Sequence, residues 1–168
     1  GGGAGSVYGS DLPLWVLPIA LSVGGVLVGL IYALGPVSGC HVNPAVTIAA
    51  WVGGRFEGRR VLGYLIVQVM GAILAAGLLA VILQGAAGGA GVATAGLGQT
   101  GWGEGYLGEY DVWAAFVVEL VVTFLFVLII LGATTPGDGQ PFAGIAIGLA
   151  LVVFLITFVN VTGCSLNP

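Results

Sequence analysis

The chain has 168 residues, of which 58% are hydrophobic and only 6% are charged. A soluble domain of this length needs more polar side chains to cover its surface, so the composition predicts an integral membrane protein. The formal net charge is −4 with only three Lys or Arg residues, which excludes a basic surface for nucleic acid. We therefore expect no nucleic-acid partner.

The N-terminal residues 1–11 are rich in Gly and lack the basic region of a signal peptide. The sequence does not begin with Met, and it stops inside a motif that occurs earlier in the chain. We therefore expect it to be a segment of a longer protein.

The first apolar segment covers residues 12–34 and contains no charged residue. It is long enough to cross a bilayer as a helix, and Pro13 and Pro18 lie near its start, where a helix tolerates Pro best. Gly25 and Gly29 form a pair of small residues spaced by four. Such a pair predicts close approach of another helix.

A polar motif follows at residues 38–45, with the sequence Ser-Gly-Cys-His-Val-Asn-Pro-Ala. Asn43 suits the N-cap of a helix and Pro44 suits its first position. The apolar run 45–52 then ends at two Gly residues. A helix of this length spans about 12–15 Å, roughly half of the ~30 Å hydrocarbon thickness, so we predict a re-entrant half-helix.

Arg55, Arg59 and Arg60 come next and are the only basic residues apart from the single His. The positive-inside rule places their side of the membrane in the cytoplasm. A second span is predicted at 61–83. The Gly-rich loop at 85–111 has acidic but no basic residues, as expected on the outer side.

Two further spans are predicted at 112–132 and 142–159, joined by the turn 133–141. The chain then ends on residues 162–168, which repeat the pattern hydroxyl-Gly-Cys-x-aliphatic-Asn-Pro. Three spans separate the two copies, so they approach the membrane centre from opposite faces. This arrangement is typical of an inverted repeat.

We expect one all-α membrane channel domain over residues 1–168. Its predicted parts are a span with the first re-entrant loop and half-helix of repeat 1 (12–60), the last span of repeat 1 (61–83), and repeat 2 as far as its Asn-Pro loop (112–168).

The sequence resembles the major intrinsic protein family, the aquaporins and glycerol facilitators, over residues 38–51, 63–71, 119–127, 142–149 and 162–168. The residues of both loop motifs most resemble the archaeal aquaporin branch. The resemblance implies an inverted-repeat bundle of six spans and two half-helices. Four spans and one half-helix would lie in this chain, without the first span, the second half-helix and the last span. It also implies a homotetramer in the cell membrane, no enzymatic activity and no cofactor.

Non-helical backbone at membrane depth is tolerated where it lines a water-filled cavity. We therefore expect the loop carbonyls to accept hydrogen bonds from a passing solute; they belong to Gly39, Cys40, His41, Val42, Gly163, Cys164, Ser165 and Leu166. The side-chain oxygen of Asn43 can cap the half-helix while its NH₂ group donates into the pore. The resemblance implies the same roles for Asn43 and Asn167, as donors at the membrane centre.

The resemblance further implies a constriction of four side chains, three of which correspond to Val23, Leu155 and Cys164. Water-selective members usually have an aromatic residue at the first position and His at the second, whereas glycerol-passing members keep the aromatic residue and have Gly. Val23 and Leu155 match neither pattern. Two aliphatic side chains suggest a wider, less polar constriction, so we predict passage of water and a leak of small neutral solutes such as glycerol.

Glu119 and Gln68 lie within predicted spans, where polar side chains are costly. We expect both to brace re-entrant loops, Glu119 through a loop N–H; a proton relay is the alternative for Glu119. His41 is expected to brace backbone and not to bind a metal.

The two Cys residues occupy equivalent positions in the two motifs, which favours a role as small residues over a disulfide. Cys164 is expected to line the pore, and it is also a candidate site for mercurial inhibitors. The aromatic residues Tyr106, Tyr110 and Trp113 fit an interfacial belt.

Three functions compete on these features. The first is a passive channel for water and small neutral solutes. The second is an ion-coupled secondary transporter, since inverted repeats and broken helices also occur there. The third, an intramembrane enzyme, needs a nucleophile with a base or a set of metal ligands, and one His without a nearby partner argues against it. We predict the channel.

Overall fold

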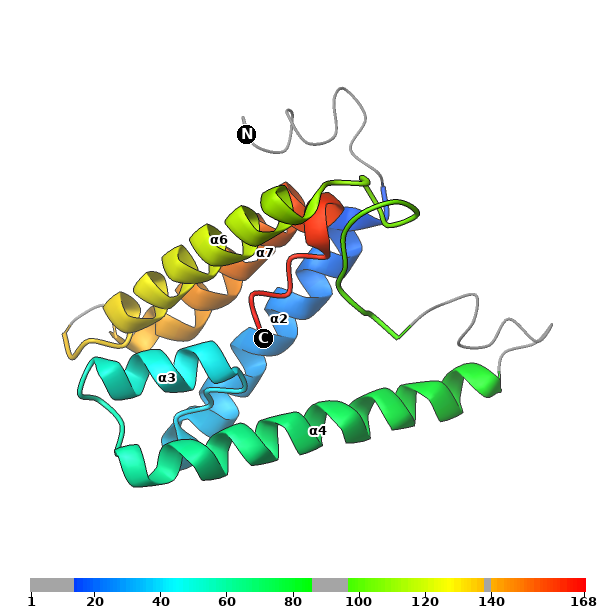
Figure 1. The fold of residues 1–168 in the computed structure, drawn as a ribbon. Coiled ribbons are helices and arrows are strands. Elements are labelled where there is room, and N and C mark those ends of the chain that lie inside the picture. The colour runs from blue at the N-terminus through cyan, green and yellow to red at the C-terminus, as the bar shows by residue number, and fades with distance from the viewer. Residues whose placement is uncertain (1–13, 86–96, 138–139) are drawn as a thin grey trace.

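The computed structural model describes residues 14–85, 97–137 and 140–168, and these residues form helices and loops without a strand. The helices are α2 (Val16–Ser38), α3 (Pro44–Val52), α4 (Gly58–Gln84), α6 (Val112–Ala133), the short 3₁₀-helix η1 (Gln140–Phe142) and α7 (Ala143–Thr162) (Figure 1). Four segments (α2, α4, α6 and η1 with α7) are long and apolar enough to cross a membrane. The predicted all-α membrane fold is confirmed. The stretch 1–11 and residues 86–96 of the predicted outer loop lie outside the described residues.

Helix α2 ends four residues later than the sequence predicts, because it continues through Pro36 to Ser38. Pro36 lacks the N–H that would bond four residues back, yet the helix closes only at Gly39. This Gly is left-handed, with φ +78°, and its N–H donates to the carbonyl of Gly35 at 2.9 Å. A left-handed Gly163 ends α7 in the same way. The glycine of each motif, and not the preceding Pro, therefore ends the helix.

The two ends of the bundle are distinguished by side-chain contacts. At one end, which we call the arginine end, Arg55 donates to the carbonyl of Leu131 at 2.5 Å and to Thr135 Oγ1 at 3.1 Å, and so ties the segment after α3 to the end of α6. The hydroxyl of Tyr32 in α2 donates to the carbonyl of Pro141 at the same end. At the opposite end lie residues 97–111, which we call the strap, beside the end of α7 (Figure 1). The two motifs therefore begin at opposite ends of the bundle.

Helices α2 and α7 cross in close contact at Gly24 and Gly148. A Cβ atom on Gly24 would lie 2.6 Å from the carbonyl oxygen of Gly148, and one on Gly148 would lie 2.7 Å from that of Gly24. The two glycines stand equally far before Asn43 and Asn167 in sequence, so the crossing relates the two halves of the chain.

The predicted pair Gly25 and Gly29 does not form this contact. A Cβ atom on either would meet nothing within 4 Å in the described part of the chain. The contact with α7 thus uses Gly24, one position before the first glycine of the predicted pair. Gly144 and Gly148, which are also spaced by four, do make close contacts, because Gly144 packs against the ring of Tyr32 and Gly148 against α2.

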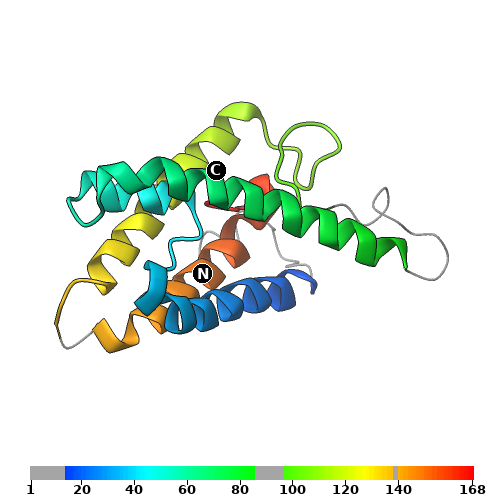
Figure 2. The same cartoon turned by 90° about the horizontal axis from the view of Figure 1, so that it is seen from below.

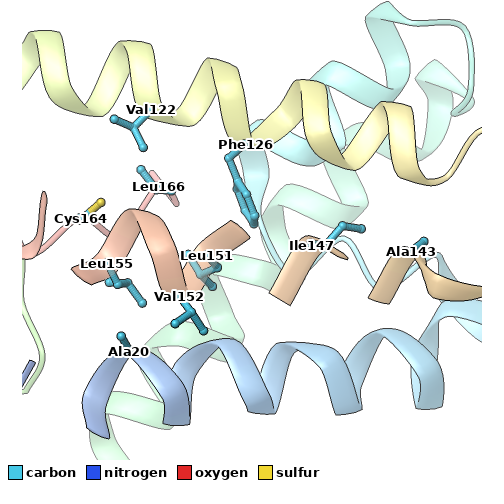
Figure 3. Packing of buried hydrophobic residues seen from close by; sticks show 10 residues of the cluster. All are labelled: Ala20, Val122, Phe126, Ala143, Ile147, Leu151, Val152, Leu155, Cys164 and Leu166. Atoms are coloured by element: carbon cyan, nitrogen blue, oxygen red, sulfur yellow. The ribbon is translucent and has the colours of Figure 1, made fainter. Parts of the chain in front are cut away.

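The buried core lies between α2, α6 and α7, and the second motif packs into it (Figure 3). Leu166 and Cys164, both 0% exposed, lie among Val122 of α6 and Leu155 of α7. The apolar side chains of the loop thus fix its polar backbone in place.

Helix α4 contributes no buried residue and lies along one side of the structure, in contact with α3 (Figures 1 and 2). Its apolar side chains are exposed along its length. Such a surface is compatible with hydrocarbon surroundings but not with water.

Candidate functional site

Asn43 caps the half-helix α3 and reaches the second motif. Its side-chain oxygen accepts hydrogen bonds from the N–H groups of Ala45 at 2.8 Å and Val46 at 3.4 Å, and Pro44 occupies the first helical position as predicted. Its NH₂ group donates to the carbonyl of Leu166 at 2.6 Å. The residue is buried, with 6% exposure.

Asn167 makes the reciprocal contact. Its NH₂ group donates to the carbonyl of Val42 at 3.0 Å. Each Asn therefore bonds the carbonyl that precedes the other Asn, which links the two loops around a local two-fold relation. An amide NH₂ carries two hydrogens, so each group keeps one N–H for a further acceptor.

The two loops also share one unusual backbone conformation. Cys40 and Val42 have φ of 48° and 41°, and the corresponding Cys164 and Leu166 have 52° and 51°. Left-handed φ values are uncommon outside Gly and costly for a β-branched residue such as Val. Strain of this kind persists where the surrounding structure enforces it, often at functional sites.

Two of the eight predicted acceptor carbonyls, those of Val42 and Leu166, are already bonded to the opposite Asn. Within the described residues, no hydrogen bond is seen to the other six. A carbonyl has two lone pairs, so Val42 and Leu166 can still accept one more bond each. The solute contacts themselves stay a prediction.

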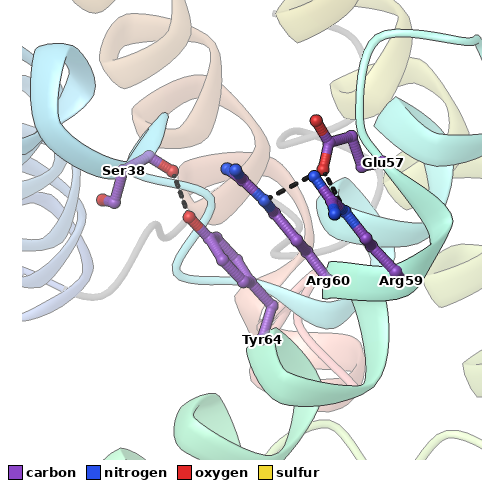
Figure 4. Close-up of polar contacts among 5 residues, drawn as sticks. All are labelled: Ser38, Glu57, Arg59, Arg60 and Tyr64. Atoms are coloured by element: carbon purple, nitrogen blue, oxygen red, sulfur yellow. Dashed lines mark hydrogen bonds and ion pairs between the residues drawn. The ribbon is translucent and has the colours of Figure 1, made fainter.

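Each loop begins from a hydroxyl residue that is held from two sides. Ser38 Oγ accepts from the N–H of Cys40 at 3.3 Å, and Thr162 Oγ1 accepts from that of Cys164 at 3.0 Å. The carbonyl of Ser38 accepts from the hydroxyl of Tyr64 (Figure 4), as that of Thr162 does from a tyrosine of the strap. The sequence analysis did not assign these tyrosines to the loops, because nothing local connects them.

Gln68 lies against the first turn of α3. Its NH₂ group donates to Thr47 Oγ1 at 3.0 Å, and the Thr47 hydroxyl donates to the carbonyl of Asn43. The side-chain oxygen of Gln68 is buried without a partner among the described residues.

Glu119 reaches the second loop through a hydroxyl and not through a loop N–H as expected. Its Oε1 accepts from Thr162 Oγ1 at 2.6 Å, and this hydroxyl in turn accepts from Cys164 N–H. The Glu119 side chain therefore contacts the loop backbone only indirectly, because the Thr162 hydroxyl lies between them.

His41 packs into an aromatic cluster at the arginine end. Its ring lies 4.8 Å from that of Phe56 and 5.3 Å from that of Tyr64, between centroids. Its Nδ1 is 3.1 Å from Thr47 Oγ1. No cluster of three His, Cys, Asp or Glu side chains suited to a metal occurs in the residues that the structure describes.

Glu57 lies on the surface nearby and pairs with Arg59 at 2.8 Å and Arg60 at 3.1 Å (Figure 4). The hydrogen bond from Arg59, and then the charge of Arg60, lower the pKa of this carboxyl. The side chains are exposed, so the pairs contribute little to stability.

A cavity of about 1040 Å³ extends from α2 to both loops. Its lining includes Asn43 and Asn167, most of the first loop, and Val23. The other two predicted constriction residues do not line it. Leu155 is 6% exposed and Cys164 is 0% exposed, within the core, and Cys164 Sγ lies 3.5 Å from the carbonyl of Phe154. The structure therefore brings Leu155 and Cys164 together in the core, whereas Val23 lies on the cavity wall.

Membrane-spanning helices, a half-helix capped by Asn, and two polar loops that meet beside a cavity define the class of a multi-pass membrane channel. The model of the family "Major intrinsic protein" matches residues 6–168. The chain belongs to this family, so it is a channel protein of the cell membrane and not an enzyme. Nothing in these findings favours an ion-coupled transporter.

The chain is also similar to three relatives, each named Aquaporin Z. It is 41% identical to that of Photorhabdus laumondii over 99% of this chain and 74% of the relative. It is 43% identical to those of Rhodopseudomonas palustris and Bradyrhizobium diazoefficiens, over 89% of this chain and 62% of each relative. The chain thus spans less than two thirds of the length of the last two.

Proposed function

We propose that the full-length protein is a passive channel for water that also passes small neutral solutes such as glycerol. The observation that supports it best is the reciprocal contact of Asn43 and Asn167 beside a cavity that both line. Each amide offers one remaining N–H, and together the two can hold a single solute oxygen at the point where the loops meet.

Exclusion of protons follows from the same geometry. A water molecule whose oxygen accepts from both amides directs its hydrogens away from the loops on both sides. It cannot accept a proton from its neighbour, so the proton-conducting chain of waters is interrupted. The N-terminus of α3, capped by Asn43, adds about +0.5 charge that repels hydronium and cations.

The solute range rests on the predicted constriction, of which Val23 lines the cavity while Leu155 and Cys164 lie in the core. Val23 is 45% exposed and lines the cavity with an aliphatic surface. An aliphatic constriction gives a larger solute few hydrogen bonds but leaves it room. We therefore expect glycerol to pass more slowly than water yet above background.

The orientation and assembly belong to the proposal as well. The arginine end holds all three Arg residues, and the positive-inside rule places it in the cytoplasm. A homotetramer with one pore in each protomer is proposed from the family resemblance alone.

The test is stopped-flow light scattering on proteoliposomes that contain the full-length protein. A sucrose gradient reports water flux and a glycerol gradient reports solute entry, with protein-free vesicles as the reference. We expect fast water flux with a low activation energy and no dependence on a Na⁺ or H⁺ gradient. Water flux at the level of protein-free vesicles contradicts the channel; glycerol entry at background contradicts only the leak.

A further inference from the structure

Several hydrogen bonds from different parts of the chain converge on Thr162, the last residue of α7. Its carbonyl accepts from the N–H of Gly101 at 3.1 Å and from the hydroxyl of Tyr106 at 3.0 Å. Its own hydroxyl bonds Glu119 and Cys164. Thr162 is 3% exposed, so these contacts are sheltered from water.

The strap supplies the partners that the end of α7 needs. The last four carbonyls of a helix have no partner inside it, and in a membrane protein such groups must be satisfied by other parts of the protein. The N–H of Gly108 donates to the carbonyl of Asn160 at 3.0 Å, beside the two bonds to Thr162. The strap is also bonded within itself, for example from the N–H of Gly103 to the carbonyl of Tyr110 at 2.8 Å.

Tyr106 is the side chain that connects the strap to the loop itself. Its ring packs on Gly101, where a Cβ atom would lie 2.9 Å from Cδ2. Its hydroxyl lies over Gly163, where a Cβ atom would be 2.8 Å from Oη. The hydroxyl is also 3.0 Å from the carbonyl of Gln99. Gly163 opens the second loop with φ +88°, so Tyr106 contacts the backbone at the point where that loop begins.

We propose that Tyr106 is a positioning residue of the pore, which acts through Thr162 and Gly163 on the backbone at Cys164. This proposal rests on the channel function proposed above, in which the second loop lines the cavity through Ser165 and Asn167. Loss of the hydroxyl frees one of the two bonds on the Thr162 carbonyl and leaves space over Gly163. The loop then moves more freely, and the constriction discriminates less between water and a larger neutral solute.

Tyr64 offers a matched comparison at the other loop. It makes the same kind of bond, from its hydroxyl to the carbonyl of Ser38 at 2.9 Å. Ser38 is exposed, however, whereas Thr162 is buried. Polar headgroups or water can replace the lost donor at Ser38, whereas the buried Thr162 carbonyl keeps only its bond from the N–H of Gly101. The consequence of removing the hydroxyl is therefore expected to be larger for Tyr106.

The first experiment measures the ratio of glycerol to water permeability for full-length Tyr106→Phe, with Tyr110→Phe in the same strap as a control. After the permeability of protein-free vesicles is subtracted, this ratio does not depend on how many channels are folded, so a mere loss of folded channels leaves it unchanged. One buried hydrogen bond corresponds to about a twofold to tenfold effect. We expect the ratio to rise at least about twofold for Tyr106→Phe, to change less for Tyr64→Phe, and to stay at the wild-type value for Tyr110→Phe.

A second experiment tests the positioning without any transport. In a Cys40→Ser background, the rate at which a maleimide labels Cys164 reports how often the second loop opens, because this thiol is fully buried. We expect severalfold faster labelling in Tyr106→Phe than in the parent protein. Equal labelling rates overturn the positioning role, and an unchanged permeability ratio overturns its effect on selectivity. If the wild-type protein passes no water, the proposed function fails, and the labelling rates still decide the role of Tyr106.

Discussion

The two re-entrant loops have the same backbone but different supports. Both begin at a left-handed Gly after a hydroxyl residue, and both end on an Asn that bonds the opposite loop. The first loop is held by Gln68 and by the aromatic rings around His41. The second is held by Glu119, by the strap and by its own burial in the core.

This difference separates two kinds of constraint on the chain. Under the proposed channel function, the loop conformation and the paired Asn residues are repeated because both halves present the same groups to the solute. The supports differ because any well-placed donor or acceptor can hold a backbone. We therefore expect equivalent changes of the paired Asn residues to have equal effects, and changes at positions whose supports or surroundings differ to have unequal ones.

The largest effect is expected from Asn43→Asp, compared with Asn167→Asp. A carboxylate caps a helix as well as an amide does, so α3 should still form. It has no N–H, however, so the bond to Leu166 is lost and a negative charge faces the pore. We expect proton or cation leak, followed with a pH-sensitive dye inside proteoliposomes, to rise at least about tenfold for each variant.

Equal leaks support the equivalence of the two loops. A leak in one variant alone would show that the two amides contribute differently to the exclusion of protons and cations. If the leak of both variants stays at the wild-type level, the result contradicts the role at the membrane centre that we propose for Asn43 and Asn167.

The next effect concerns the glycines that open the loops. Gly39→Ala and Gly163→Ala both force a side chain into a left-handed conformation, at a cost of about 1–2 kcal/mol. In Gly163→Ala the new Cβ atom also meets the hydroxyl of Tyr106 at 2.8 Å, whereas in Gly39→Ala the nearest atom is His41 Nε2 at 3.1 Å. We expect thermal unfolding in detergent to show the larger loss for Gly163→Ala.

A double variant locates the origin of this difference. Adding Tyr106→Phe should restore part of the stability lost in Gly163→Ala and none of that lost in Gly39→Ala. Losses that simply add would mean that the hydroxyl does not contact Gly163.

Removal of the two supporting side chains, Glu119 and Gln68, is expected to lower the thermal stability by amounts that differ less. Glu119→Ala leaves the donor of the buried Thr162 hydroxyl without its partner, at a cost of about 1–3 kcal/mol. Gln68→Ala removes a neutral bond to Thr47, worth about 0.5–1.5 kcal/mol. The same thermal measurement should therefore rank Glu119→Ala below Gln68→Ala in stability. The reverse order would show that the first loop depends more on its support.

The sequence predicts the repeated parts of this structure better than the parts that differ. The N-cap at Asn43 and the half-helix follow from the Asn-Pro motif, which occurs twice in the sequence. The number of spans follows from the local apolar segments. The contacts of Tyr106 do not follow, because the strap and Thr162 are far apart in sequence and no spacing rule connects them. The helix end at Ser38 was missed because Pro36 resembles a helix breaker, whereas the left-handed Gly39 is the actual end. Helix α7 likewise continues past the predicted end to Thr162 and ends at the left-handed Gly163.

The smallest effect concerns mercurial inhibition at the two cysteines, which occupy equivalent positions in the loops but have different surroundings. Both are buried, but Cys40, with 6% exposure, lines the cavity, whereas Cys164 is 0% exposed and packs in the core. The sequence analysis names Cys164 as the candidate mercurial site, but a bulky reagent reaches a thiol on the cavity wall more readily than one in the core. We therefore expect Cys40→Ser to remove most of the mercurial inhibition of water flux and Cys164→Ser to remove little. The opposite result would mean that the second loop opens often enough to admit the reagent. Tyr106→Phe, which is expected to loosen that loop, should then increase the share of inhibition that depends on Cys164.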